Sequence, residues 1–304
     1  MTGDPRHYQI ATLAALLAYG MVRLEFQVSV TQSATMLAAA LATQWLCTRW
    51  WRLPAFDPRS PLISGLSLSL LLRTTDLGVA VVAAVVTIAS KFVIRHRGKH
   101  LYNPTNFGLV VMLIATDAAW VSPGQWGSPA FVAYLMAGLG GLVVYRAARS
   151  DVTYAFGACY VVLVLGRALW LGDPLAVPMH HLQNGALLLF VFHMISDPRT
   201  TPDSRAGRVL FAALVAWGAY YVQFELFRTN GLLWALFFAA PLVPIIDRLL
   251  PGNRYRWTRP SIGRVVLKGA RTHETSHLGP AGGWGPRVGH AGRARVLRVL
   301  RGQG

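Results

Sequence analysis

Two polar segments of this 304-residue chain combine residue types that bind anions and other polar ligands. The first, residues 90–108, reads SKFVIRHRGKHLYNPTNFG, and the second, residues 196–208, reads SDPRTTPDSRAGR. In the first segment we expect Asn103 and Pro104 to open a helix, because Asn is a common N-cap and Pro suits the first helical turn. The free backbone N–H groups and the positive dipole of such a terminus suit an anionic or carbonyl-rich ligand.

The second segment begins where an apolar run ends, at Asp197 and Pro198. We expect its hydroxyl and carboxylate side chains to cap the next helix, and these are Thr200, Thr201, Asp203 and Ser204. A purely structural interpretation stays open for both segments, because turns rich in Asn, Asp, Pro and Thr are common between helices.

Histidine and cysteine supply the remaining candidates for chemistry. His193 lies inside an apolar run, one helical turn before Asp197, so we expect the two side chains to hydrogen-bond as a proton-coupled pair. The alternative is a histidine that packs between helices and bonds to a backbone carbonyl. Cys47 and Cys159 cannot provide the four thiolates of an iron–sulfur cluster, so the chain either has no metal centre or shares one with a partner.

The elements that must position these residues are predicted membrane spans. Of the residues, 54% are hydrophobic and 13% are charged, whereas a soluble domain has about a quarter charged residues. Ten apolar runs are candidate transmembrane helices: residues 9–22, 31–47, 61–72, 77–94, 105–121, 129–145, 153–171, 182–195, 209–224 and 231–246. The third and the eighth are short of the roughly 20 residues that cross hydrocarbon.

The basic residues predict how the spans are oriented, because cytoplasmic loops are enriched in Lys and Arg. With ten crossings, only Arg23, Arg73, Arg167 and Arg228 fall on the outer side, and the other 25 basic residues fall on the inner side. Both short runs are therefore expected to cross, and both termini are expected in the cytoplasm. Residues 1–250 form the predicted transmembrane domain, with halves of about 1–125 and 126–250 that are inverted five-helix repeats.

The two short runs also resemble each other. Ser64 and Gly65 begin the first, Asn184 and Gly185 begin the second, and each is followed by an Asn-containing start of another apolar run. Paired Gly-interrupted spans in two halves of a membrane protein indicate a binding site near the bilayer midplane.

The formal charge of +17 has a membrane explanation. It is spread over the loops between spans, which indicates contact with anionic lipids and argues against nucleic acid. Residues 251–304 are rich in Gly, Arg, His and Pro, and we expect a basic, disordered cytoplasmic tail.

The chain resembles the RnfD/NqrB family in the order of a short span, Lys91, Gly98, Tyr102-Asn103-Pro104, Gly108 and the turn Ser196-Asp197-Pro198. The resemblance extends from about Phe56 to Arg248. Family members are membrane subunits of the Rnf and sodium-pumping NADH:quinone oxidoreductase complexes. The resemblance implies an all-α polytopic protein of the inner membrane, with ten helices in two inverted halves, that works with other redox subunits and with quinone.

The resemblance also implies a flavin. Family members carry flavin mononucleotide (FMN) on the threonine of a Gly-Ala-Thr motif after the fifth span, and this sequence contains no Gly-Ala-Thr. We therefore expect a non-covalent flavin, either FMN or riboflavin, and no metal. The residues expected to bind it are Ser64, Gly65, Lys91, Asn103, Asn106, Asp197 and Thr200. Small residues at such places also serve as helix-packing positions.

The expected function is that of an electron-transfer subunit of an oxidoreductase complex, passing electrons from the flavin toward quinone or a partner, with coupled ion transport. The sequence has no Gly-rich nicotinamide-binding fingerprint, so electrons must come from another subunit. The alternative is a non-redox transporter that uses the cavity between inverted halves for a small solute. A third interpretation is a structural subunit that has lost its cofactor.

Overall fold

The computed structural model describes residues 4–23, 29–121 and 150–255. All of them belong to one compact unit, Met1–Pro260. The expected sixth span, most of the loop after the fifth span, and the basic tail from residue 256 onward lie outside the described residues. Those expectations therefore stay predictions.

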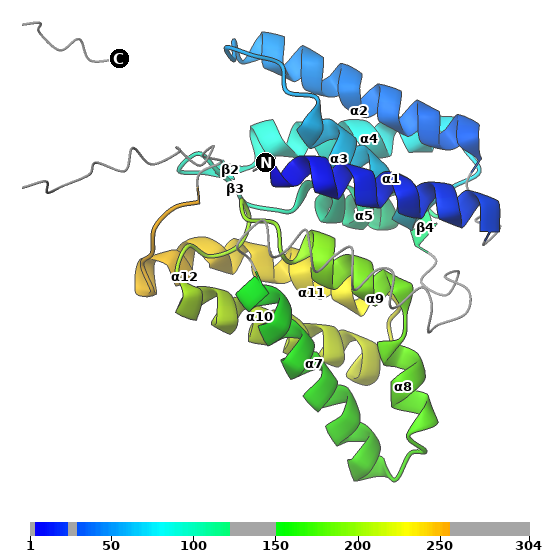
Figure 1. Cartoon of the computed structure of the whole chain (residues 1–304), viewed down its shortest axis with the longest axis vertical. Helices are drawn as coiled ribbons and strands as arrows, with labels where there is room; N and C mark the ends of the chain where they lie inside the picture. Colours follow the sequence, from blue (N-terminus) through cyan, green and yellow to red (C-terminus); the bar gives the residue numbers. More distant parts are fainter. Residues whose placement is uncertain (1–3, 24–28, 122–149, 256–304) are drawn as a thin grey trace, which may run out of the picture. The chain divides into compact units, whose positions relative to one another are not determined.

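The described residues are mostly helical (Figure 1). In the first part of the chain the elements are α1 (Pro5–Arg23), α2 (Val30–Trp50), α3 (Arg59–Leu71), β1 (Leu72–Arg73), α4 (Leu77–Val93), β2 (Arg95–His96), β3 (Lys99–His100), α5 (Pro104–Ala115) and β4 (Trp120–Val121). In the second part they are α7 (Ser150–Leu171), α8 (Ala176–Leu182), α9 (Gly185–Leu189), the π-helix η1 (Phe190–Met194), α10 (Arg205–Tyr220), the π-helix η2 (Tyr221–Glu225), α11 (Gly231–Ala239), the 3₁₀-helix η3 (Ala240–Leu242) and α12 (Val243–Leu249).

Two stretches of helix within the described residues are long and apolar enough to cross a membrane, Ser150–Leu171 and Gly231–Leu249. The second consists of α11, η3 and α12 in succession. Three shorter apolar helices are Leu77–Val93, Pro104–Ala115 and Gly185–Met194. The helical class expected from the sequence is confirmed, and the count of ten crossings stays a prediction.

Side-chain caps explain where several helices begin. Asn103 Oδ1 accepts a hydrogen bond from Asn106 N at 3.0 Å, and Pro104 is the first residue of α5. Ser204 Oγ accepts from Gly207 N at 3.0 Å and caps α10 in the same way. These caps satisfy backbone donors that have no partner within the helix. The predicted helix start at Asn103 is confirmed. Of the four residues expected to cap the later helix, Ser204 does so, whereas Thr200 and Thr201 donate to Asp197 O.

Two element boundaries differ from the sequence prediction. The helix expected over 105–121 ends at Ala115, because Thr116 is extended and its Oγ1 accepts a hydrogen bond from Ala118 N at 3.0 Å. The chain then forms β4, which pairs antiparallel with β1. The predicted outer loop before the eighth span contains a short helix, α8, with Pro178 in its first turn, where proline is tolerated.

Helix packing follows one scheme in each part of the chain (Figure 1). In the first part α2 packs on α4, and α4 on α5. In the second part α7 packs on α10, and α10 on α11. The two parts meet where α5 contacts α11, and their buried apolar side chains form one continuous core.

Two irregular elements flank the region where the predicted site residues gather. The strands β2 and β3 form a hairpin whose turn residues, Arg97 and Gly98, both have positive φ. The π-helix η1 continues α9 without a break, and an extra residue per turn changes the direction of the side chains that follow it.

Candidate functional site

A cavity of about 240 Å³ opens among α1, α3, α4, the start of α5 and the turn that follows η1. Its polar lining comes from both predicted segments and from earlier helices: Arg6, Gln9, Gln44, Asp57, Ser60, Ser64, Ser67, Lys91, Arg95, His100, Asn103, Thr105, His193, Ser196, Asp197 and Arg199. The structure thus brings together residues that lie far apart in the sequence.

Four of the seven predicted binding residues line this cavity: Ser64, Lys91, Asn103 and Asp197. Asn103 connects the two predicted segments, because its Nδ2 donates to Met194 O at 3.3 Å and to Asp197 Oδ2 at 3.4 Å. Asn103 therefore has two roles at once, as helix cap of α5 and as the bridge to the turn after η1.

The other three predicted residues, Gly65, Asn106 and Thr200, lie outside the cavity lining. A Cβ atom at Gly65 would lie 2.9 Å from Leu37 Cδ2, so this glycine permits close packing of α3 on α2. Asn106 is buried and donates to Leu233 O at 3.2 Å. Thr200 Oγ1 donates to Asp197 O at 3.3 Å, which fixes the turn that carries the Asp197 carboxylate.

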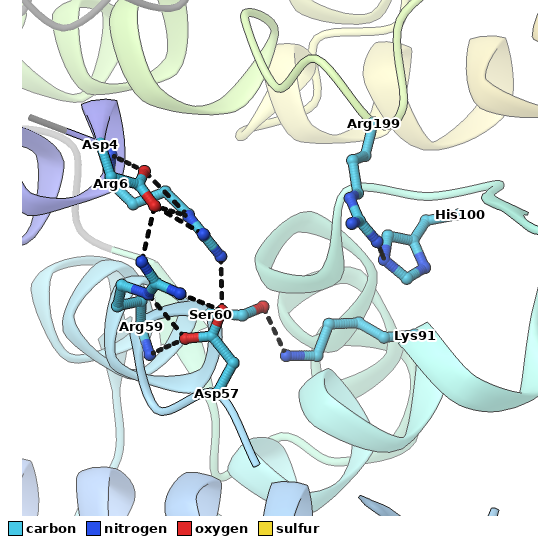
Figure 2. Close-up of polar contacts among 8 residues, drawn as sticks. All are labelled: Asp4, Arg6, Asp57, Arg59, Ser60, Lys91, His100 and Arg199. Atoms are coloured by element: carbon cyan, nitrogen blue, oxygen red, sulfur yellow. Dashed lines mark hydrogen bonds and ion pairs between the residues drawn. The ribbon is translucent and has the colours of Figure 1, made fainter. Parts of the chain in front are cut away.

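Lys91 is the most deeply buried charged side chain of the cavity, at 4% exposure. Its Nζ donates to Ser60 Oγ at 3.0 Å, as Figure 2 shows. Arg95 lies one helical turn further along, and its Nε donates to the carbonyl of Lys91. The end of α4 and the start of β2 therefore place two basic side chains in the same region.

A network of four charged residues borders the cavity at the starts of α1 and α3 (Figure 2). Arg6 contacts Asp57 at 2.7 Å and Asp4 at 2.6 Å, and Arg59 contacts Asp4 at 2.7 Å and Asp57 at 2.8 Å. Burial raises the pKa of Asp57, but the hydrogen bonds and charges of Arg59 and Arg6 outweigh it and lower that pKa to about 2. The Asp57 carboxylate is therefore ionised and already neutralised.

His100 lies beside Arg199, with 3.5 Å between His100 Nε2 and Arg199 Nη1 (Figure 2). Burial lowers the pKa of His100 to about 3, and the positive charges of Arg199, Arg95 and Lys91 act in the same direction. The imidazole is therefore neutral at physiological pH.

The expected hydrogen bond between His193 and Asp197 is wrong. Neither ring nitrogen of His193 has a hydrogen-bond partner among the described residues, although the side chain is 5% exposed. The prediction assumed regular helical spacing, and the π-turn η1 removes that spacing. Gln44 Oε1 is another buried acceptor of the cavity lining without a partner in the described chain.

Sequence reasoning missed the cavity residues that come from α1, α2, the start of α3 and the loop before α3. Arg6, Gln44, Asp57 and Ser60 lie 31 or more residues before Lys91, and no local motif connects them to it. Acidic residues are scarce in this chain, with 12 Asp and Glu in total, so an Asp two residues before the basic Arg59 was a usable signal for Asp57.

Comparison with known proteins gives one family. Residues 119–256 match the model of the NQR2, RnfD, RnfE family. The RnfD protein of the ion-translocating oxidoreductase complex of Escherichia coli O1:K1 is 32% identical over 134 residues, which cover 43% of this chain and 33% of that protein. The proteins of the same name from Citrobacter koseri and Shigella boydii serotype 18 are each 32% identical, over 40% and 44% of this chain and over 34% and 36% of their own lengths.

The matched part of the chain therefore spans about a third of the length of these relatives. It includes Asp197 and Thr200 but not the predicted site residues of the first segment. The resemblance inferred from the motifs is confirmed over this region, where residues 119–256 are similar to the NQR2, RnfD, RnfE family.

Proposed function

We propose that this chain is a membrane-embedded electron-transfer subunit of an ion-translocating oxidoreductase complex. The observation that carries the proposal is the family match over residues 119–256, together with relatives that are named as the RnfD component of such a complex. Electrons reach the chain from another subunit and leave toward quinone or a further partner. Ion translocation is a property of the whole complex.

The proposed architecture has ten crossings in two inverted halves, in the inner membrane, with both termini in the cytoplasm. Supporting it, the packing order α2–α4–α5 in the first half has a counterpart, α7–α10–α11, in the second. The corresponding helices α5 and α11 contact each other, as expected for elements beside a pseudo-two-fold axis. Basic residues concentrated in alternate loops support the orientation.

The proposed cofactor is a non-covalent flavin in the cavity described above. The donor set fits such a group: Asn103 and Asp197 provide amide and carboxylate groups at the wall, and the buried polar atoms of His193 and Gln44 have no partner in the described chain. An apolar ring with a few polar edge atoms needs this kind of lining. The volume of about 240 Å³ suits one ring system, and the exposed side chains of Arg95 and Arg199 at the cavity would be available to the rest of the ligand.

In this arrangement the flavin, when bound, supplies the one- and two-electron chemistry. Asn103 would orient the ring edge, because its own position is fixed by hydrogen bonds to Met194 O and Asp197 Oδ2. Ser64 and Ser67 on α3 are buried and small, so they allow the ring to approach the helix closely. Gly65, Asn106 and Thr200 hold the surrounding helices and turns in place without contact to the ligand.

The test is the visible absorbance and in-gel fluorescence of the full chain, purified in detergent, before and after denaturation. Yellow protein that releases flavin on denaturation supports the proposal. Asn103→Ala and Asp197→Ala should each lower flavin occupancy without lowering membrane insertion. The matched control is Asn184→Ala, which removes an equivalent helix cap, at α9, away from the cavity.

Three outcomes would contradict the proposal in different ways. A fluorescent band after denaturation would mean a covalently attached flavin. A folded, colourless protein that is stabilised by small solutes would favour the alternative function, a small-solute transporter. Unchanged flavin occupancy in both Asn103→Ala and Asp197→Ala would mean that the flavin does not bind in this cavity.

A further inference from the structure

More basic than acidic side chains line the cavity. Four basic side chains and two carboxylates line it: Arg6, Lys91, Arg95 and Arg199, and Asp57 and Asp197. His100 adds no charge, because burial and its basic neighbours keep the imidazole neutral. The lining therefore has a surplus of basic groups over acids.

The carboxylates and Arg6 are engaged with other groups. Asp57 forms ion pairs with Arg59 and Arg6, and Arg6 forms another with Asp4. Asp197 Oδ1 accepts a hydrogen bond from the backbone N–H of Arg199 at 3.0 Å, and Oδ2 accepts from Asn103. Both acids of the lining therefore have partners that hold them in place.

The three other basic side chains of the cavity lining are not part of this ion-pair network. Within residues 4–23, 29–121 and 150–255, no salt bridge includes Lys91, Arg95 or Arg199. Lys91 Nζ has three N–H donors, and its hydrogen bond goes to the neutral Ser60 Oγ. The charge of Asp197 acts on Lys91, but both oxygens of that carboxylate already accept hydrogen bonds from other groups. Burial of the Lys91 amine therefore favours a further anion in the cavity.

We propose that Lys91, Arg95 and Arg199, with the hydroxyl of Ser60, form a binding site for a phosphate monoester. The site faces the cavity from two sides, Lys91 from α4 and Arg199 from the turn after η1 (Figure 2). A second observation points to a ligand: His193, 5% exposed, lines the same cavity with both ring nitrogens unpartnered in the described chain. Charge-assisted hydrogen bonds to phosphate are about twice as strong as neutral ones.

The inference rests on the proposed function in one respect: if a flavin occupies the cavity, the phosphate group in this site is that of FMN. The resident flavin is then FMN and not riboflavin, which has no phosphate. The same chemistry is present in the headgroup of phosphatidic acid, which reaches basic groups at the cytoplasmic side of a membrane. The test separates these two sources.

The experiment measures dissociation constants of FMN and riboflavin for the full chain in neutral detergent, by flavin fluorescence. The wild-type protein should bind FMN about tenfold or more tightly than riboflavin, as loss of charge-assisted hydrogen bonds predicts. Lys91→Met should weaken FMN binding by that factor and leave riboflavin unchanged. Inorganic phosphate should compete with FMN and not with riboflavin.

Two further variants keep the test decisive. Arg199→Gln changes an exposed side chain, so it keeps the test valid if Lys91→Met does not fold, and it should also reduce the preference for FMN. Arg205→Met removes an exposed positive charge outside the cavity lining and should preserve the preference. An equal loss in all three variants would mean a general effect of net charge and would overturn the site.

The outcomes distinguish the inference from the proposed function. Equal affinity for FMN and riboflavin in the wild type would overturn the phosphate site and leave the flavin proposal intact. Binding of neither flavin, with Lys91-dependent binding of phosphatidic acid over phosphatidylcholine in nanodiscs, would support the site with lipid as its source and overturn the flavin. No Lys91-dependent binding of FMN, inorganic phosphate or phosphatidic acid would overturn the site.

Discussion

The side-chain amide of Asn106 on α5 donates a hydrogen bond to the backbone carbonyl of Leu233 on α11, at 3.2 Å. This bond lies where the two parts of the chain meet, and Asn106 is 1% exposed. It joins two helices that the repeat hypothesis makes equivalent.

Asn106→Ala should lower the free energy of unfolding by about 1 kcal/mol, because the buried hydrogen bond from its amide to Leu233 O is lost. Thermal unfolding in detergent measures this. Gln183→Ala, which truncates an amide outside the contact between α5 and α11, is the control and should change the midpoint little. Equal midpoints for both variants would mean that the contact between α5 and α11 does not depend on this bond.

Gly108→Ala should destabilise the packing of α5 on α4. A Cβ at Gly108 would overlap Thr87 Oγ1 and lie 3.0 Å from Thr87 Cβ and 3.2 Å from Thr87 Cα. Overpacking of this kind costs about 1–3 kcal/mol. Gly157→Ala on α7 is the matched control, since a Cβ there meets no atom within 4 Å and should raise stability slightly.

Lys99 connects the β2–β3 hairpin to the second part of the chain through two ion pairs. Its Nζ lies 3.0 Å from both Asp203 Oδ1 and Asp247 Oδ2, and the three side chains are 13%, 16% and 21% exposed. Lys99→Met leaves the two carboxylates without the positive charge between them, so the free energy of unfolding should fall by about 2 kcal/mol. The unfolding midpoint at low salt measures this, and a loss no larger than that of Arg205→Met would contradict it.

His100 should make the fold sensitive to acid. Its pKa is about 3 in the folded chain and 6.5 in an unfolded one, so below pH 6.5 the unfolded state binds the extra proton. Protonation of His100 therefore does not lower the free energy of unfolding well above pH 6.5, and it lowers that free energy by about 2 kcal/mol at pH 5. Unfolding midpoints of wild type and His100→Gln at pH 7.5 and pH 5 measure this. A gap between the two proteins that does not change with pH would contradict it.

The sequence alone was sufficient for the local features of the site. Asn103 and Pro104 open a helix as expected, and the cap of α10 is one of the four residues proposed for it, because caps depend on residues within one turn. The apolar composition predicted a helical membrane protein, and motif order predicted the family that the comparison found. These inferences need only neighbouring residues or their order along the chain.

Tertiary structure decided which residues share the cavity. Ser64 lines it whereas the adjacent Gly65 faces α2, and no sequence pattern distinguishes the two. The π-turn η1 separated His193 from Asp197, which regular spacing had paired. Ser60 became the partner of Lys91, 31 residues away, because α3 packs beside α4. Helical periodicity predicts which residues share a face of a helix. Which other helix that face contacts depends on long-range packing, and a single sequence does not show this.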